Sequence, residues 1–271
     1  MRRRRLLYLP PEAAPTSLPA ASEALTDPPG LLAAGGSLTP DWLRHAYRHG
    51  IFPWYSAGEP ILWWSPPQRM VFRPEALRVP RSLRQSARNR GYLIGLDTNF
   101  NSVMAGCASR GAMPHSQNQS TEIIELSPTD KTESQAPDAT WIVPEMVAAY
   151  AALHAAGDAH SVEVWKDGVL VGGLYGVSLG GMFWGESMFS RARDASKVAL
   201  LALAAECRQR GIGLIDAQFH TPHLESLGGF EMVRAEFVAE VAKRTDSAGA
   251  GASWHRAPAP IDGVSLQDGR V

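Results

Sequence analysis

One apolar segment constrains the fold of this chain more than any other part of its sequence. Residues 195–210 read as a helix that begins after Asp194 and ends before Gly211, and its side chains are apolar on most sides until Glu206. A helix without a broad polar face cannot lie on the surface, so it must be buried against other elements. The sequence therefore predicts a core built around this helix.

The segments on either side of this helix predict the sheet against which it packs. Three strands joined by glycine-containing turns come before it, and two strands separated by a short helix follow it. We place the strands at residues 161–165, 169–178, 182–189, 212–218 and 230–240. This order indicates an α/β class with a mixed sheet, and it is the core order of the N-acetyltransferase-like (GNAT-like) fold.

Composition divides the chain into two predicted domains and two irregular segments. Residues 1–68 form a small N-terminal domain with a proline-rich lead-in and one short helix after Thr39, and residues 69–245 form the acetyltransferase-like catalytic domain. Within the second domain, residues 110–138 are rich in Ser, Thr, Gln and Asn and read as a disordered insertion. Residues 246–271, rich in Gly, Ala and Pro, read as a flexible tail.

The composition also excludes several classes of protein. With 26 Lys and Arg against 27 Asp and Glu, the net charge of −1 excludes a uniformly basic nucleic-acid binder, although not one with a local basic cluster. Cys107 and Cys207 are far apart and form no CxxC motif, which argues against a disulfide framework or a zinc knuckle. No segment has the apolar length of a membrane span or a signal peptide, so we expect a cytoplasmic protein without a membrane partner.

Two carboxylates and an amide are the strongest candidates for catalytic groups. Glu186 lies in an otherwise apolar strand, so its ionised form needs a cationic partner or hydrogen bonds. Strand alternation places Asp216 and Gln218 on one face at a strand end, where ligands bind in α/β sheets. Phe183 and Glu186 lie on opposite faces under strict alternation, and a bulge at Gly185 would be needed for both to line one pocket. The pattern alone fits a structural hydrogen-bond network equally well.

A local basic cluster lies within this nearly neutral chain. Seven arginines and one glutamate between residues 69 and 90 give the segment a charge of +6. Arg81, Arg84 and Arg88 recur at helical spacing and would share one face, and guanidinium groups suit phosphate. A solvated charged surface explains such a cluster equally well.

The sequence contains no convincing metal or cofactor motif. His220 and His223, near Asp216, have a spacing that a metal could use, but two histidines so placed are common by chance. Gly172 and Gly173 lie inside a strand and lead into no helix, so they do not form a phosphate-binding loop. We therefore expect no metal and no cofactor.

Several short motifs spread over the chain occur together in one protein family. They read G-I-F-P-W at 50–54, W-W-S-P at 63–66, T-W-I at 140–142, H-S-V-E-V-W at 160–165, G-G-L-Y-G at 172–176, G-E-S-M-F-S at 185–190, A-S-K at 195–197 and D-A-Q at 216–218. In this combination the chain resembles the leucyl/phenylalanyl-tRNA–protein transferases from about Gly30 to residue 240. The resemblance implies an aminoacyltransferase that moves Leu or Phe from aminoacyl-tRNA to the N-terminal Lys or Arg of acceptor proteins. Such acceptors would then be degraded under the N-end rule.

The resemblance also implies roles for individual residues. Gln218 would orient the acceptor amine, Asp216 would polarise it, and Glu186, together with Gln218, would bind the cationic acceptor peptide. The donor side chain would enter an apolar pocket lined by Leu174, Phe183, Met188, Leu200, Leu203 and Ile215. The tRNA would meet Trp54 and Trp141 at its 3′ adenosine and Arg81, Arg84 and Arg88 along the acceptor stem.

Two other functions remain open from the sequence. An acetyl-CoA acetyltransferase of the same fold would bind pyrophosphate on a glycine-rich loop before its main helix, but residues 190–194 read S-R-A-R-D. A non-catalytic adaptor for N-terminal Lys or Arg would use Glu186, but it would have no use for the tryptophans or the basic cluster. Leucyl transfer, acetylation from acetyl-CoA, or peptide binding alone would distinguish the three.

Overall fold

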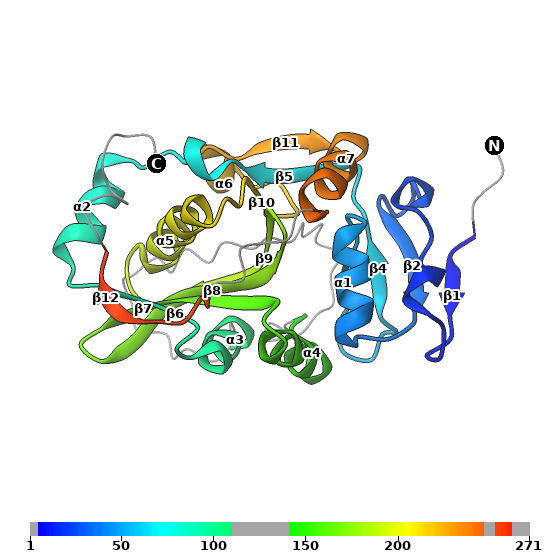
Figure 1. Cartoon of the computed structure of the whole chain (residues 1–271), viewed down its shortest axis with the longest axis horizontal. Helices are drawn as coiled ribbons and strands as arrows, with labels where there is room; N and C mark the ends of the chain where they lie inside the picture. The colour runs from blue at the N-terminus through cyan, green and yellow to red at the C-terminus, as the bar shows by residue number, and fades with distance from the viewer. Residues whose placement is uncertain (1–4, 110–140, 247–252, 262–271) are drawn as a thin grey trace, which may run out of the picture.

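The fold consists of a small four-stranded sheet beside one helix and a larger eight-stranded sheet with helices on both faces (Figure 1). The structure is a computed structural model, and it describes residues 5–109, 141–246 and 253–261. The mixed α/β class predicted from the sequence is confirmed. The predicted insertion at 110–138 lies outside the described residues.

The N-terminal part of the chain forms the four-stranded sheet, in the order β1-β2-β4-β3. The strands span Leu7–Leu9 (β1), Leu31–Gly35 (β2), Phe52–Pro53 (β3) and Leu62–Trp64 (β4). Helix α1 spans Pro40–Arg48 and begins after Thr39, as predicted, with its proline in the first turn, where no N–H is needed. The buried Trp63 donates its indole N–H to the carbonyl of Gly35 at 2.8 Å, which ties β4 to the end of β2.

The larger sheet has the strand order β11-β5-β10-β9-β8-β7-β6-β12. The strands span Gln68–Phe72 (β5), Leu93–Leu96 (β6), Ala159–Lys166 (β7), Val169–Leu179 (β8), Met182–Ser190 (β9), Leu214–Asp216 (β10), Phe230–Val233 (β11) and Arg256–Pro260 (β12). Strand β10 is parallel to β9 and the other neighbours are antiparallel, which confirms the mixed sheet.

Helices cover both faces of this sheet. They span Arg81–Asn89 (α2), Phe100–Ala108 (α3), Pro144–Ala155 (α4), Ala195–Gln209 (α5), Pro222–Ser226 (α6) and Arg234–Thr245 (α7), with short 3₁₀ turns at Pro15–Ser17, Ala21–Glu23 and Pro74–Ala76. Helix α5 lies on one side of the central strands, and α3 and α4 lie on the other (Figure 1). Twelve of the fifteen residues of α5 are buried, which confirms the burial predicted from its sequence.

The sheet divides the apolar interior into two clusters. The α5-side core is built around α5 and includes Leu174, Phe183, Met188, Leu203 and Ile215. The opposite core is built around α1, α3, α4 and α7 and includes Tyr47, Met104, Tyr150, Trp184 and Phe237. Neighbouring residues of β9 therefore contribute to different cores, as the alternation of a strand requires.

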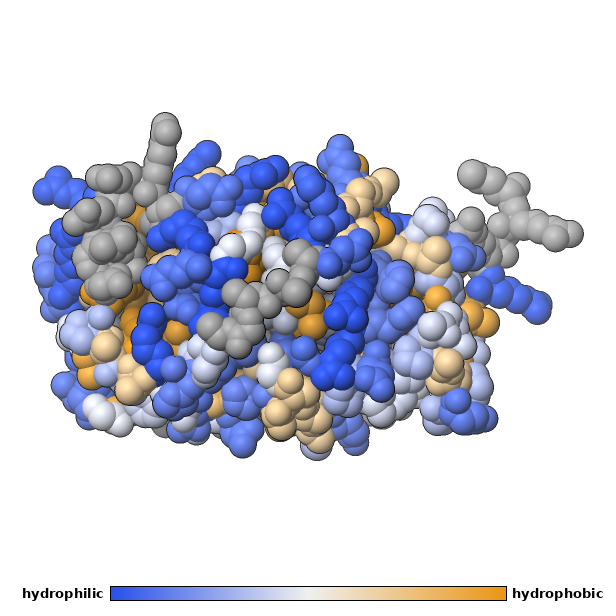
Figure 2. All heavy atoms as spheres, in the orientation of Figure 1, coloured by the Kyte–Doolittle hydropathy of each residue, from blue (hydrophilic) through white to orange (hydrophobic). Residues whose placement is uncertain are grey.

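The face of the molecule drawn in Figure 2 is mainly polar. Hydrophilic side chains cover most of the face shown in Figure 2, with smaller apolar areas between them. In the part of the chain that the structure describes, no helix is both long enough and apolar enough to cross a membrane.

One predicted strand was wrong over most of its length. The last strand was predicted at 230–240, but β11 ends at Val233 and helix α7 follows from Arg234 to Thr245. Phe237 and Val241 are both fully buried and four positions apart, which is the spacing of one helix face. The apolar residues after Val233 recur at helical spacing, so the prediction of an extended strand there was wrong.

Part of the predicted flexible tail is ordered. Within residues 246–271, strand β12 pairs antiparallel with β6 at the edge of the large sheet. Trp254 precedes this strand and is buried, with a relative exposure of 7%. Flexibility was predicted from the Gly, Ala and Pro content of the segment. That prediction left out Trp254, whose large apolar ring is buried and attaches the segment to the core.

Candidate active site

Glu186 occupies a bulge in the centre of the large sheet. In the pairing of β8 with β9, Gly176 faces Gly185 and Tyr175 faces Ser187, so Glu186 is the extra residue between them. A side chain at position 176 is impossible here, because a Cβ built on Gly176 would lie 2.1 Å from the carbonyl oxygen of Trp184. The register shift confirms the bulge beside Gly185, and it changes the alternation of β9 so that Phe183 and Met188 both lie in the α5-side core.

Two tyrosines hold the carboxylate of Glu186. The hydroxyl of Tyr47 on α1 donates to Oε1 and the hydroxyl of Tyr150 on α4 donates to Oε2, each at 2.7 Å. Burial raises the pKa of Glu186 to about 7, while the two tyrosine hydrogen bonds lower it and nearby Asp216 raises it. The sequence required a cation or hydrogen bonds for this buried carboxylate, and the structure supplies two hydrogen-bond donors. With a pKa of about 7, the carboxylate changes its charge near neutral pH.

Asp216 forms a buried ion pair with an arginine from β5. Both carboxylate oxygens accept from the guanidinium of Arg69, and both side chains are fully buried. Arg69 also donates to the carbonyl of Gly50 at 2.9 Å, and it lies over the rings of Phe52 and Phe237. Arg69 is therefore committed to Asp216 and does not belong to a phosphate-binding surface, although it was counted in the basic cluster.

Gln218 lies just past the end of β10. The strand ends at Asp216, so the strand alternation predicted for these two residues does not reach Gln218, which adopts a left-handed conformation with a φ of 56°. Its backbone N–H donates to Oδ1 of Asp216 at 3.0 Å, and its side-chain amide approaches Oε1 of Glu186 at 3.4 Å. Asp216 thereby fixes the turn that aims Gln218 at Glu186.

A small pocket opens onto Glu186 and Gln218. It is lined by Phe52, Pro53, Trp54, Trp141, Glu186, Gln218 and Phe219. The ring centroids of Trp54 and Phe219 are 5.8 Å apart, and both Trp54 and Trp141 are half-buried. The structure thus brings four predicted site residues, which are widely separated in the sequence, to one opening.

The six predicted donor-pocket residues lie together in the α5-side core. In the sheet, Leu174 faces Met188 and Phe183 faces Ile215, while Leu200 and Leu203 come from α5 above them. All six are at most 6% exposed. Phe183 and Glu186 nevertheless remain on opposite sides, because Glu186 bonds to tyrosines of the opposite core.

Between these two sides, the sheet is open at Gly185. Strand β10 pairs with β9 only up to Trp184, and Gly185 is half-buried in the middle of the sheet. Among the described residues, a Cβ built on Gly185 would meet only the carbonyl oxygen of Asp216, at 3.5 Å. A small group can therefore approach the backbone at this point, between the polar pocket and the apolar cluster.

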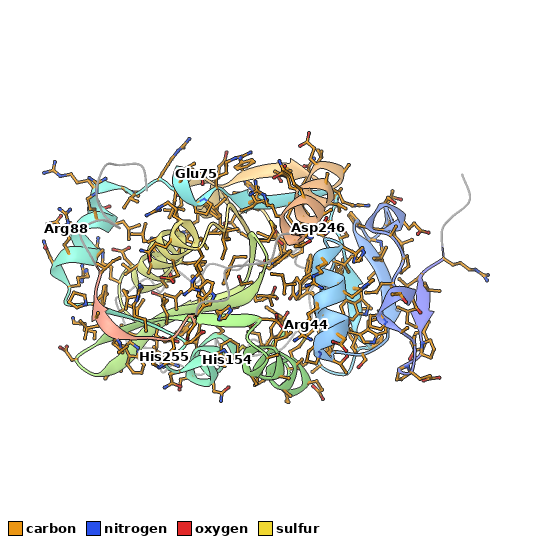
Figure 3. All side chains as sticks on the ribbon, viewed as in Figure 1. Arg44, Glu75, Arg88, His154, Asp246 and His255 are labelled. Carbon is orange, nitrogen blue, oxygen red and sulfur yellow. The ribbon has the colours of Figure 1, made fainter. Side chains whose placement is uncertain are left out.

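The predicted phosphate-binding arginines lie away from the pocket. Arg81 and Arg88 are exposed on α2 and Arg84 is half-buried. Arg88 on α2 and Arg44 on α1 lie on opposite sides of the molecule in Figure 3, and α1 packs beside β3, which carries the pocket residues Phe52 and Pro53. A ligand that contacts both α2 and the tryptophan pocket would have to extend across the molecule.

The described residues contain no group of three or more His, Cys, Asp or Glu side chains placed to hold a metal ion. His220 instead lies 3.1 Å from a carboxylate oxygen of Glu225, and Asp216 is committed to Arg69.

Comparison with known proteins identifies the family. One family model, described as leucyl/phenylalanyl-tRNA protein transferase, matches residues 118–242, and a second, described as its N-terminal domain, matches residues 36–67. The leucyl/phenylalanyl-tRNA–protein transferase of Chromohalobacter salexigens is 50% identical over 242 residues, covering 89% of this chain and 86% of that protein. The chain belongs to the leucyl/phenylalanyl-tRNA–protein transferase family.

Other members of this family are similarly close. The transferases of Azoarcus sp. and Nitrosomonas eutropha are 49% and 47% identical, over 88% and 89% of this chain and 92% and 93% of theirs. A solved GCN5-related N-acetyltransferase from Kribbella flavida has a TM-score of 0.32 and 13% identity, covering 70% of this chain and 60% of that chain. A TM-score this low does not support a fold assignment, so the fold is described from its own strand order.

Sequence reasoning missed three residues that organise the site of this family member. Arg69, Tyr47 and Tyr150 hold the two carboxylates, but Arg69 was counted only in the basic cluster and neither tyrosine was a candidate. One signal was present, since Arg69 precedes the apolar run Met-Val-Phe and therefore stands at the start of a buried strand. A buried arginine requires a buried acid, and Asp216 was a candidate.

Proposed function

We propose that this chain transfers Leu or Phe from aminoacyl-tRNA to the N-terminal Lys or Arg of acceptor proteins, marking them for N-end-rule degradation. One observation carries the proposal: in a chain of this family, Glu186, Gln218, Trp54 and Trp141 line a single opening. A carboxylate for a cation and aromatic rings for a base are the groups that a cationic peptide and a tRNA end require.

Glu186 binds the cationic side chain of the acceptor. A buried carboxylate with a pKa of about 7 carries a partial charge at neutral pH, and an arriving guanidinium or ammonium favours the ionised form. Tyr47 donates to one carboxylate oxygen and Tyr150 to the other, and these bonds keep the ionised carboxylate oriented before the acceptor binds. An acceptor with a neutral N-terminal side chain would leave this charge buried and unpaired.

Gln218 orients the α-amine of the acceptor toward the donor ester. The new bond joins the amine nitrogen to the aminoacyl carbonyl carbon, the bond to the ribose oxygen of the tRNA breaks, and the proton that the amine loses goes to that ribose oxygen, which leaves as a hydroxyl. A carboxamide scarcely accepts a proton, so Gln218 supplies geometry rather than base strength. Asp216 is fully buried and reaches the reaction only through the backbone of Gln218, so its part is positioning.

The donor occupies both sides of the opening at Gly185. Its Leu or Phe side chain enters the α5-side core among Leu174, Phe183, Met188, Leu200, Leu203 and Ile215. Its 3′ adenosine stacks near Trp54 and Trp141, which line the pocket. The acceptor stem then extends to Arg81, Arg84 and Arg88 on α2, where guanidinium groups bind phosphate.

The ester of an aminoacyl-tRNA is already activated, so this reaction needs orientation and charge stabilisation rather than ATP. The test uses the purified chain, leucyl-tRNA and a peptide beginning with Arg, and mass spectrometry detects the leucylated peptide. A peptide beginning with Ala is the matched control and should not react. Absence of leucylation would contradict the proposal. Acetylation from acetyl-CoA would favour an acetyltransferase, and peptide binding alone would favour an adaptor.

A further inference from the structure

Trp254 belongs to the same apolar cluster as the donor-pocket residues, although it lies after the catalytic region in the chain. It is buried in the α5-side core, which contains all six of those residues. Its ring centroid is 5.8 Å from that of Phe183, with the planes tilted by 34°. Within the described residues, therefore, the C-terminal segment reaches the candidate donor pocket through one side chain.

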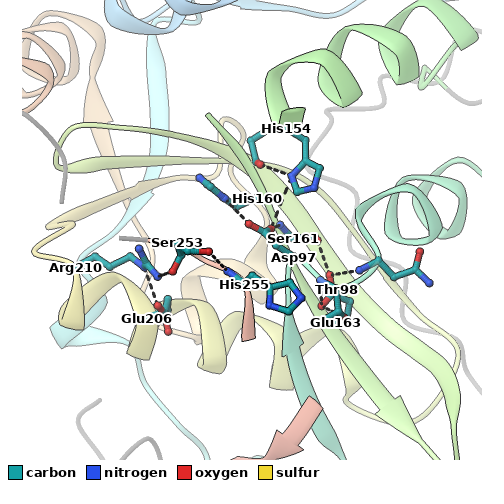
Figure 4. Close-up of polar contacts among 12 residues, drawn as sticks. Asp97, Thr98, His154, His160, Ser161, Glu163, Glu206, Arg210, Ser253 and His255 are labelled. Carbon is teal, nitrogen blue, oxygen red and sulfur yellow. Dashed lines mark hydrogen bonds and ion pairs between the residues drawn. The ribbon is translucent and has the colours of Figure 1, made fainter. Parts of the chain in front are cut away.

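A histidine and an arginine pack against the Trp254 ring and hold its orientation. The imidazole of His160 stacks on it with centroids 4.2 Å apart and planes 11° apart, and the guanidinium of Arg210 lies 4.5 Å from its centroid. His160 is itself held by Asp97, whose carboxylate oxygen lies 2.7 Å from Nδ1 (Figure 4). These contacts reduce the freedom of the indole ring to move away from Phe183.

The backbone on both sides of Trp254 is also anchored. Arg210 donates to the carbonyl of Ser253 at 2.9 Å, as Figure 4 shows, and Arg256 donates to Glu206 on α5 at 3.2 Å. Strand β12 then pairs with β6. The segment is thus attached to α5 and to the sheet, which together form the surroundings of the donor pocket.

Phe183 is confined on its other side by the sheet. A Cβ built on Gly176 would lie 2.5 Å from Cε1 and 2.7 Å from Cζ of Phe183, so the phenyl ring packs directly on the glycine backbone. The ring packs against the Gly176 backbone and against the Trp254 indole, so the indole is one of the groups that confine it.

We propose that Trp254 is a positioning residue that braces Phe183 and thereby limits the size of the donor side chain. The inference rests on the proposed function, because it assigns a determinant of selectivity to the same donor site. A pocket wall held from behind cannot move to admit a larger ring, so the C-terminal segment contributes to the choice of amino acid without touching it.

The test compares donors in the full-length chain. Leucyl-tRNA and tryptophanyl-tRNA are used with one Arg-initiated peptide, and kcat/KM is measured for wild type, Trp254→Ala and Trp254→Phe. Removing the brace should raise the ratio of tryptophanyl to leucyl transfer about tenfold in Trp254→Ala, the scale on which apolar pockets discriminate. Trp254→Phe should give an intermediate ratio, and it keeps the test usable if the alanine variant does not fold.

Trp42→Phe is the matched control, because Trp42 is a buried tryptophan that stacks on Trp63 beside the small sheet. It should lower thermal stability without changing the donor ratio. An unchanged ratio in both Trp254 variants, with active wild type, would overturn this inference alone and leave Trp254 a purely structural residue. Failure of wild type to transfer leucine would overturn the proposed function, and this inference with it.

Discussion

Both sides of strand β9 bury apolar side chains, but the side that faces the opposite core also buries the carboxylate of Glu186. On one side, Glu186 meets two tyrosine hydroxyls and lies near the Asp216–Arg69 ion pair. On the other side, Phe183 and Met188 pack in the α5-side core against aliphatic side chains. Under the proposed function, the polar side, with Glu186, would supply charge and orientation for the reaction, and the apolar side, facing α5, would supply a shape for the donor side chain. If the proposed function holds, one bulged strand separates the residues that act on the acceptor from those that select the donor.

This separation predicts that substitutions on the two sides change different quantities. Polar-side variants should change acceptor use, pH dependence or the stability of buried charges. Apolar-side variants should change donor preference and leave acceptor use alone. Variants that change both quantities together would contradict the separation.

The largest effect is expected from breaking the buried ion pair. Arg69→Met leaves the fully buried Asp216 without its cation, which should lower the free energy of unfolding by about 3–5 kcal/mol. Denaturant unfolding of Arg69→Met and of the double variant Arg69→Met/Asp216→Asn measures the change, and the double variant should recover part of it. The partly exposed pair of Arg244 and Glu240 is the control, since Arg244→Met should cost less than about 1 kcal/mol. Equal losses at the two arginines would show that burial does not govern this pair.

The next largest effect is expected at the acceptor carboxylate. Glu186→Gln keeps the shape of the side chain but removes the charge that binds Lys or Arg, so kcat/KM for an Arg-initiated peptide should fall about 100-fold. Steady-state kinetics with saturating leucyl-tRNA measures this, and the rise should be mainly in the KM for the peptide. Glu163→Gln is the matched control, because Glu163 is also a buried carboxylate of this sheet but bonds to Ser161 and Thr98. If tRNA affinity falls while peptide KM stays constant, the role of Glu186 is misassigned.

The difference between the two sides also explains what could be predicted from the sequence. The apolar side is local: its six donor-pocket residues all lie between positions 174 and 215, in strands and a helix whose periods and turns are visible in the sequence. The polar side is assembled from distant segments, since Arg69 and Asp216 are 147 positions apart and Tyr47 and Glu186 are 139 apart. Residues so far apart share no helical or strand period. The sequence therefore indicated Glu186 and Asp216, but not the tyrosines and the arginine that bind them.

The departures at helix α7 and at the C-terminal segment have the same physical origin. Helix α7 was predicted as a strand because its apolar residues were judged by type, and Trp254 was assigned to a flexible tail because its neighbours are small. In both cases tertiary packing, which local composition does not record, decided the structure. The resemblance of the motifs to a known family indicated the site residues, but not these supports.

A smaller effect is expected on the apolar side. Leu203→Ala removes a buried side chain of α5 from the donor pocket, and it should raise the preference for phenylalanyl over leucyl donors about tenfold because the pocket enlarges. Competition between the two charged tRNAs for one peptide measures this ratio. Met104→Ala on α3 is the control, since it opens a cavity in the opposite core with a similar loss of stability. A shift in donor ratio by Met104→Ala as well would mean that the cores are not independent.

The smallest effect is expected from one hydroxyl on the polar side. Glu186 must be ionised to bind a cation, so the peptide KM should rise as the pH falls below its pKa of about 7. The Tyr47 hydroxyl lowers that pKa by hydrogen bonding, so Tyr47→Phe should raise it and move the midpoint of the KM profile to higher pH, with only a several-fold loss at pH 7. Tyr92→Phe is the matched control, because the Tyr92 hydroxyl donates to the carbonyl of Arg193 and has no contact with Glu186. A midpoint that moves to lower pH in Tyr47→Phe would mean that another group titrates, because loss of a donor cannot favour the ionised carboxylate.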